Sequence, residues 1–244
     1  MIKMLKMELY EFRHDFICLF MIVIPLAYGM FSGSGYMEDN YFNLKQGGYE
    51  VLMAMLHDAP ATCLLISAFP ALLIGKSFSN RTIVPKITAG NSRSNVFFSK
   101  AISILSISAI ATIVYSISGA AAVTLKYGWN APAFGSIFTL IKIMICTILL
   151  YSVIFSIIIF WAVIFKDTIR TIIASVITIF INAIYIAYGR GWKMPISMHP
   201  MIVLRRILQS NSLVQFMGFS LYAAVLLSVI LILSYTIFRR CELK

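Results

Sequence analysis

Few side chains in this sequence are of the kinds that carry out chemistry, and those few are scattered along it. Residues 75–77, Gly-Lys-Ser, match the end of a phosphate-binding loop, but Pro70 replaces the glycine that such a loop needs five residues earlier. His14, His57 and His199 are far apart, and the sequence has no HExxH, paired-glutamate or Gly-x-Ser-x-Gly motif. The four cysteines have no metal-ligand spacing. The sequence therefore predicts no catalytic residues, no metal site and no cofactor held by this chain.

Two ionisable residues inside apolar stretches are the candidates for a substrate pathway. Asp58 lies seven residues into the second apolar stretch described below, and Lys142 lies seven residues into the fourth. Charged side chains within a membrane face the interior of a bundle or a wet cavity, so the two could pair or line a polar vestibule. The alternative is that these helices begin later, near Ala59 and Ile143, with both charges at the level of the lipid headgroups.

The composition is that of an integral membrane protein. The chain has 244 residues, of which 60% are hydrophobic and 12% charged, and its mean hydropathy is +0.90. Soluble domains are about half apolar and about a quarter charged, so this chain could not cover its surface by folding in water. In a membrane protein, the net charge of +11 indicates Lys and Arg retained on the cytoplasmic side rather than a nucleic-acid partner.

Six stretches are apolar enough to cross the hydrocarbon core, which takes about 20 residues of helix. They cover residues 16–34, 51–75, 96–123, 135–165, 169–188 and 216–238. We interpret them as helices, because an open sheet would leave backbone groups without hydrogen bonds in lipid. The predicted fold class is all-α: one polytopic membrane domain, residues 1–244, with six transmembrane helices.

The distribution of basic residues predicts the orientation of these helices. With the N-terminus inside, the inner segments contain thirteen Lys and Arg residues and the outer segments contain six. This asymmetry predicts that both termini are cytoplasmic. The exception is the segment before the last helix, which contributes four of the outer six.

Residues 1–15 have the pattern of an amphipathic helix at the inner membrane interface. Ile2, Leu5, Leu9 and Phe12 fall on one helical face, and the charged residues lie largely elsewhere. The alternative is a frayed N-terminus without a fixed structure.

Residues 189–215 are too apolar for an ordinary loop and too short for a seventh span. Pro195 and Pro200 interrupt the segment, and residues 201–208 could form a short helix that begins at Pro200. We therefore predict a re-entrant or interfacial hairpin on the outer face, in which Arg205 and Arg206 extend to the headgroups.

The longest polar insert, residues 76–97, lies between the second and third spans and has no acidic residue. Asn and Thr at residues 80–82 can cap a helix start, and Gly90 can adopt the left-handed conformation that ends one. A short helix is therefore predicted within this cytoplasmic loop. The apolar residues of this predicted helix are Ile83, Val84 and Ile87. The basic residues that flank this apolar surface are Arg81, Lys86 and Arg93.

Several of these residues also carry a resemblance to a known family. Phe78 with Arg81-Thr82, then Gly90 with Ser92-Arg93, then Lys100 at the third span resemble the pattern around the coupling helix of bacterial ABC exporter permeases. The number of spans, the N-terminal helix and the hairpin before the last span are also similar to that family, over the whole chain. The most similar type is the small lantibiotic-immunity or peptide-export permease.

The resemblance implies a transport subunit rather than an enzyme. A separate ATP-binding cassette ATPase would hold ATP and magnesium, and two permeases, identical or related, would sit on two ATPases in the bacterial cell membrane. The loop would dock in the ATPase through nine residues: Arg81, Thr82, Ile83, Val84, Lys86, Ile87, Gly90, Ser92 and Arg93. The exported substrate would be a lantibiotic-like peptide, a drug or another amphipathic molecule.

Two other classes of function remain open from the sequence. A membrane-embedded enzyme, such as a lipid-modifying enzyme or an intramembrane protease, needs acidic or histidine clusters near one interface, and the sequence offers only His57-Asp58 and Asp167, at opposite ends. A stand-alone secondary transporter typically has interrupted spans and charges near the midplane. An ATPase encoded beside this chain would favour the exporter over both.

Overall fold

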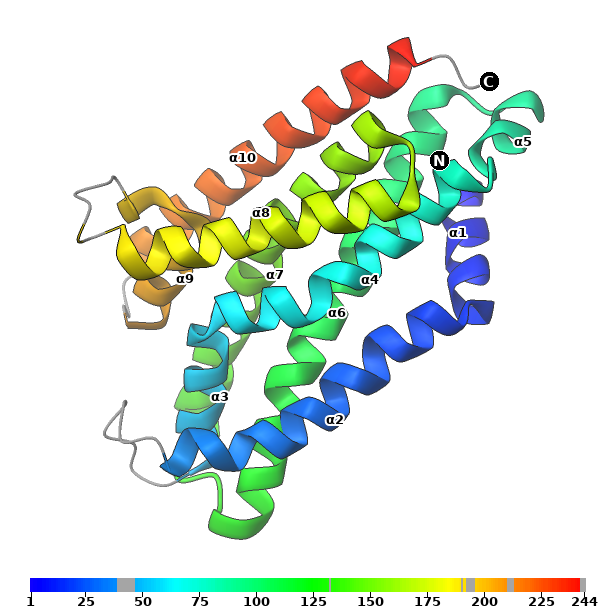
Figure 1. Cartoon of the computed structure of the whole chain (residues 1–244). Helices are drawn as coiled ribbons and strands as arrows, with labels where there is room; N and C mark the ends of the chain where they lie inside the picture. The colour runs from blue at the N-terminus through cyan, green and yellow to red at the C-terminus, as the bar shows by residue number, and fades with distance from the viewer. Residues whose placement is uncertain (39–46, 132, 190, 192–195, 210–212, 242–244) are drawn as a thin grey trace.

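A computed structural model describes the chain except for residues 39–46, 132, 190, 192–195, 210–212 and 242–244 (Figure 1). All regular secondary structure in the described part is helical. The helices are α1 (Ile2–His14), α2 (Phe16–Glu38), α3 (Gly48–His57), α4 (Ala59–Ser79), α5 (Ile83–Thr88), α6 (Arg93–Tyr127), α7 (Ala133–Phe165), α8 (Thr168–Tyr188), the short 3-10 helix η2 (Ile196–Met198), α9 (Pro200–Gln209) and α10 (Leu213–Arg240).

Among the described residues, six helices are long and apolar enough to cross a membrane, as in a multi-pass membrane protein. They are α2, α4, α6, α7, α8 and α10. The prediction of an all-α fold with six such helices is therefore confirmed. In a bilayer, helices satisfy their own backbone hydrogen bonds, which is why long apolar segments adopt this structure.

The second predicted span, residues 51–75, is not one continuous helix. The structure divides it into α3 and α4, with Asp58 between them at φ −87° and ψ 51°. Pro60 explains the break, because in a continuous helix its ring would clash with the carbonyl of Leu56, four residues earlier, and it has no backbone N–H to donate to that carbonyl. In the first turn of a new helix, that missing donor costs least.

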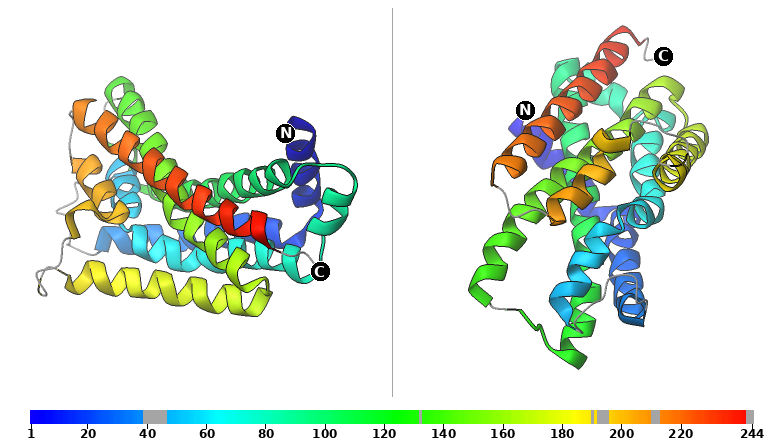
Figure 2. Two further views of the ribbon diagram at one scale, coloured as in Figure 1. Left: turned by 90° about the horizontal axis from the view of Figure 1, so that it is seen from above. Right: turned by 90° about the vertical axis from the view of Figure 1, so that its left-hand side faces the viewer.

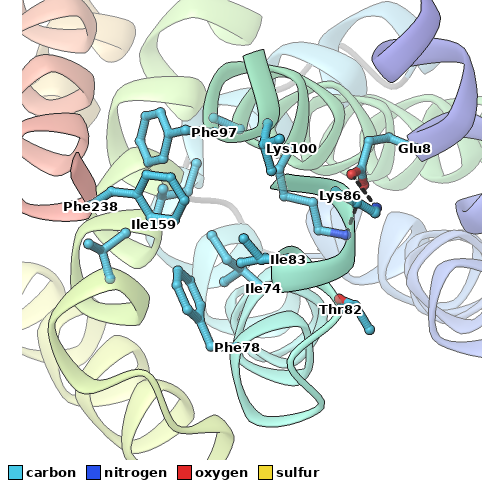
Figure 3. A pocket seen from close by; sticks show the side chains of 13 residues that line it. Glu8, Ile74, Phe78, Thr82, Ile83, Lys86, Phe97, Lys100, Ile159 and Phe238 are labelled. Atoms are coloured by element: carbon cyan, nitrogen blue, oxygen red, sulfur yellow. Dashed lines mark hydrogen bonds and ion pairs between the residues drawn. The ribbon is translucent and has the colours of Figure 1, made fainter. Parts of the chain in front are cut away.

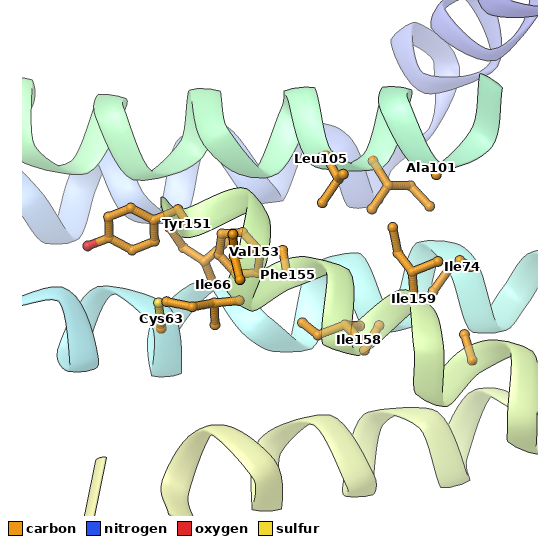
Figure 4. Packing of buried hydrophobic residues seen from close by; sticks show 14 of the residues in the cluster. Cys63, Ile66, Ile74, Ala101, Leu105, Tyr151, Val153, Phe155, Ile158 and Ile159 are labelled. Atoms are coloured by element: carbon orange, nitrogen blue, oxygen red, sulfur yellow. The ribbon is translucent and has the colours of Figure 1, made fainter. Parts of the chain in front are cut away.

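Helix α7 is the centre of the apolar core. Tyr151, Phe155 and Ile159 on α7 are fully buried, and Figure 4 shows this helix packed between α4 and α6. Cys63 and Ile66 approach from α4, and Leu105 approaches from α6. α8 packs on α4 and α10 packs on α7, so both lie outside this central layer.

The closest helix pair is α2 and α6, which meet through glycines. A methyl group added to Gly33 would lie 2.6 Å from the carbonyl oxygen of Gly119, and one added to Gly29 would lie 2.3 Å from that of Tyr115. Lipid provides little hydrophobic drive for helices to associate, so close packing through small residues supplies much of the attraction.

Both chain termini and α5 lie at one end of the bundle (Figures 1 and 2). A contact between distant segments fixes this arrangement: the Arg93 guanidinium, at the start of α6, donates to the carbonyl oxygens of Arg239 (2.7 Å) and Cys241 (3.2 Å) at the end of α10. These carbonyls belong to the final turn, where no helical donor remains for them. We call the end of the bundle that contains the start of α1, α5 and the end of α10 the terminal end.

Ile2–His14 form a helix, but its inward face differs from the one expected for an amphipathic interface helix. Met4, Glu8 and Phe12 are buried against the protein, whereas Ile2 and Leu9 are exposed. The difference arises because a glutamate finds buried partners, described below. That the exposed apolar residues lie in a membrane interface stays a prediction.

The segment before the last span contains the predicted short helix, α9, which begins at Pro200. Met201, Val203, Leu204 and Ile207 are buried, and the helix packs mainly on α7. Arg206 is exposed. Residues 190, 192–195 and 210–212 of the predicted hairpin, and the side chain of Arg205, lie outside the description, and the re-entrant placement stays a prediction.

The glycine contact between α2 and α6 gives a test with an internal control. Gly33→Val should lower the melting temperature of the purified protein, because forced overpacking typically costs about 1–3 kcal/mol. Gly35→Val, on the same helix, should have little effect, because nothing lies within 4 Å of an added methyl there. Thermal unfolding in detergent measures both, and equal melting temperatures for the two variants would contradict the close approach.

Candidate functional site

The loop between α4 and α6 is the candidate functional site, and it folds as a short helix between two turns. α4 ends at Ser79, Arg81 adopts a left-handed conformation (φ 54°), and α5 covers Ile83–Thr88. Gly90 has φ 88°, a conformation that glycine adopts without strain, and the chain then reverses into α6. The prediction of a helix that begins after residues 80–82 and ends before Gly90 is confirmed.

Side-chain hydrogen bonds hold both ends of this loop. The Thr82 hydroxyl donates to the Ser77 carbonyl oxygen (3.3 Å) rather than capping α5, so its role differs from the one expected. The Asn91 side chain donates to the Lys86 carbonyl oxygen (2.8 Å) at the end of α5. Ser92 caps α6 by accepting from the Asn95 backbone N–H (3.3 Å).

The orientation of α5 differs from the one expected for a helix whose apolar side faces a partner. Ile83 is buried in the core of this chain, and Ile87 packs against the same core. Val84 is half-buried. The outward face of α5 instead contains Pro85 and Thr88, three residues apart, and the exposed Arg81 and Ala89 flank the helix just before and after it.

The inward face of α5 is fixed by a charge cluster formed by Glu8, Glu11, Lys86 and Lys100. Figure 3 shows Glu8, Lys86 and Lys100 of this cluster. The Glu8 carboxylate is fully buried and accepts from Lys86 Nζ (2.7 Å) and Lys100 Nζ (2.8 Å). Glu11, which is partly exposed, accepts from Lys86 at 2.9 Å. Two carboxylates therefore balance two ammonium groups, and the cluster joins α1, α5 and α6.

Hydrogen bonding in the cluster affects the proton affinity of Lys86. Burial alone lowers the pKa of this ammonium group, but hydrogen bonds to Glu8 and then Glu11 outweigh it, so the pKa of Lys86 lies above its ordinary value of 10.5. A raised pKa in the folded state gives stability that is present below the ordinary value and is lost as the pH rises above it. Lys86 therefore keeps its charge, and its contribution to the cluster, at neutral pH.

Aromatic packing borders the charge cluster on the side toward α10. The ring centroids of Phe97 and Phe238 are 5.4 Å apart, and those of Phe78 and Phe238 are 6.2 Å apart (Figure 3). Phe78 belongs to α4, Phe97 to α6 and Phe238 to α10. The loop therefore lies where three helices long and apolar enough to cross a membrane come together.

The two residues predicted for a substrate pathway lie far from this loop, and the structure gives each a different neighbour. Asp58, at the break between α3 and α4, accepts a hydrogen bond from the Tyr36 hydroxyl (2.6 Å). Lys142 lies within α7, with its Nζ 5.9 Å from the centroid of the Phe216 ring. α4 begins at Ala59, as the alternative interpretation expected, but α7 continues through Lys142. A pair between Asp58 and Lys142 stays a prediction.

Sequence reasoning missed the part of Glu8 and Glu11 in the site. The signal was present: they are two of the three acidic residues of the N-terminal segment, and they are three positions apart, on one side of a helix. Their partners lie 75 to 92 residues away, so no local pattern could assign the pairs. Within the described residues, no three His, Cys, Asp or Glu side chains are grouped to hold a metal ion.

Comparison with known proteins adds no family to these observations. No protein-family model matches the chain, and no curated protein matches its sequence.

Removal of the buried carboxylate should release the loop. In Glu8→Gln, Lys86 and Lys100 would face each other without a full balancing charge, and breaking a buried ion pair on one side typically costs about 3–5 kcal/mol. We expect backbone amides of residues 83–88 to exchange hydrogen several-fold faster, as mass spectrometry would measure. The matched control is Glu11→Gln, whose carboxylate is 42% exposed and should matter less. Unchanged exchange in Glu8→Gln would show that the cluster does not hold α5.

Proposed function

We propose that this chain is the permease subunit of a bacterial ABC-type exporter, driven by an ATPase on a separate chain. The observation that carries the proposal is α5. It is a short helix between two membrane-crossing helices, it lies at the terminal end of the bundle, and it presents an exposed side while its other side is fixed by buried charges. A helix that is exposed on one side and held by buried ion pairs on the other is suited to transfer force from a soluble partner.

The ATPase would contact the outward face of α5 rather than its isoleucines. Arg81, Pro85, Thr88 and Ala89 are exposed, and Arg81 supplies a positive charge at one end of the face. Ser92 is exposed just beyond the turn at Gly90. Such a narrow projection fits a groove on a partner, with ATP and magnesium held on the ATPase and not on this chain.

The charge cluster would make the loop move as one unit with the spans. Because Glu8 joins α5 to α6 and α1, displacement of α5 by the ATPase would tilt α6 directly, and the contact between Phe78 and Phe238 would carry it to α4 and α10. Lys86 and Ile87 act in this proposal as inward anchors. Arg93 acts by joining α6 to α10.

The remaining surfaces suit a membrane assembly. α2, α8 and α10 present exposed apolar side chains such as Phe31, Phe180 and Leu221, which would contact lipid or a second permease copy or relative. We place both termini in the cytoplasm and the protein in the bacterial cell membrane. The exported substrate would be a lantibiotic-like peptide, a drug or another amphipathic molecule, and Asp58 with Tyr36 would offer it a polar contact.

The orientation can be tested with single cysteines at the two ends of α6. The native cysteines are buried and would be replaced by serine. Ser92→Cys and Lys126→Cys, both at exposed positions, should then react from opposite sides of the membrane. An impermeant maleimide applied to intact cells should label only Lys126→Cys. Labelling of Ser92→Cys alone would invert the orientation, and labelling of both would contradict a membrane-crossing α6.

The proposed ATPase contact is tested by enlarging an exposed residue on α5. A photo-crosslinking residue at position 88 should capture, in native membranes, a protein that mass spectrometry identifies as having a phosphate-binding loop. Thr88→Trp should abolish ATP hydrolysis in the purified complex without changing hydrogen exchange in α1, because Thr88 has no part in the core. Arg170→Trp, at an exposed position in the first turn of α8, is the control. Capture of proteins without a nucleotide-binding motif, or full ATP hydrolysis in Thr88→Trp, would exclude docking on this face.

A further inference from the structure

An open groove lies between α6 and α7 at the end of the bundle opposite the termini. Its volume is about 480 Å³, within the range of about 300–1,000 Å³ that is typical of ligand sites. One wall consists of Ile117, Ala121 and Leu125, which follow one another at every fourth position of α6. The facing wall consists of Leu140 and Met144 on α7.

Small residues and a fixed tryptophan create this groove. Ala121 leaves space between the larger side chains of its neighbours on α6, and Leu52 of α3 packs against Ala120 to close the back. Trp129 forms the end wall. Its carbonyl oxygen accepts from the Tyr49 backbone N–H (3.3 Å), and its ring meets the Tyr49 ring edge-on at 5.7 Å. The groove is therefore built into the packing of three helices.

The lining formed by the described residues is almost entirely apolar. Thr124 is its one hydroxyl-bearing residue, and that hydroxyl donates to the Ala120 carbonyl oxygen at 2.7 Å. An apolar surface of this kind offers water few hydrogen-bond partners, whereas an ordered water needs two to four. Leu125 is 88% exposed and Ile117 is 43% exposed, so the groove opens sideways. Both walls belong to helices long and apolar enough to cross a membrane, so in a bilayer this opening would face hydrocarbon chains.

The rim of the groove has the chemistry of a headgroup site. Lys126 and Tyr127 are exposed in the last turn of α6, directly after Leu125. Aromatic side chains gather at the membrane interface, and the ammonium group of a lysine there attracts the phosphate of an anionic lipid. We propose that the groove binds one acyl chain of an anionic phospholipid, whose phosphate lies at Lys126. This inference does not depend on the proposed transport function.

The groove supplies its own probe, because Trp129 lies in its wall. Trp161→Phe and Trp192→Phe leave Trp129 as the sole tryptophan. The protein is placed in nanodiscs of phosphatidylcholine that contain increasing fractions of phosphatidylglycerol brominated on its acyl chains, which quenches nearby tryptophan fluorescence. We expect quenching that saturates at a low fraction of brominated lipid. In Ala121→Phe, which fills the groove from an exposed position, the saturating component should fall several-fold.

Two controls decide between a site and ordinary contact with the bilayer. Ala187→Phe adds the same ring at an exposed position near the corresponding end of α8 and should leave the quenching unchanged. In Lys126→Gln, brominated phosphatidylglycerol and brominated phosphatidylcholine should quench the Trp129 fluorescence equally.

Three outcomes would contradict the proposal. If quenching rises only in proportion to the fraction of brominated lipid, and equally in Ala121→Phe, the groove does not bind an acyl chain specifically. Absence of quenching at every fraction would overturn the proposal in favour of a groove covered by a second copy. Preference for phosphatidylglycerol that survives in Lys126→Gln would overturn the phosphate position.

Discussion

The terminal end of this bundle depends on one buried carboxylate. Glu8 lies between Lys86 and Lys100 with both ammonium groups within 2.8 Å, and none of its side chain is exposed. The loop that contains α5 is also held by Ile83 in the core and by the hydrogen bonds of Thr82 and Asn91, whereas exposed ion pairs alone would add little. A buried carboxylate shared by two lysines requires all three side chains to stay in contact, because a buried charge without a partner is energetically costly. The position of α5 follows from this requirement.

The rest of the fold is held by contacts of a different kind. Away from the terminal end, the helices pack through apolar side chains and, between α2 and α6, through the backbones of Gly33 and Gly119. Such contacts fix how closely two helices approach but tolerate small rotations of one helix against the other. The charge cluster, in contrast, fixes which side of α5 faces the protein. The chain thus combines a specified terminal end with a closely packed but apolar middle.

The sequence was informative wherever the cause of the structure is local. Hydrophobic runs gave the six long helices, and the turn residues before Ile83 and at Gly90 gave the bounds of α5. It was not informative where a distant segment decides. Ile83 turns inward because Lys86 is drawn to Glu8, and the N-terminal helix buries Glu8 instead of Ile2 for the same reason. The groove at Ala121 also depends on Trp129 and α3, so no single stretch predicts it.

Helix α6 connects these regions and sets how they can influence one another. It is one continuous helix of 35 residues, about 50 Å long. Lys100 joins its first turns to the charge cluster, Gly119 meets α2 farther along, and Ala121 and Leu125 line the groove near its other end. A helix without a proline or a break transmits tilt along its whole length. The proposed partner on α5 and the proposed lipid in the groove would therefore act near opposite ends of the same continuous helix.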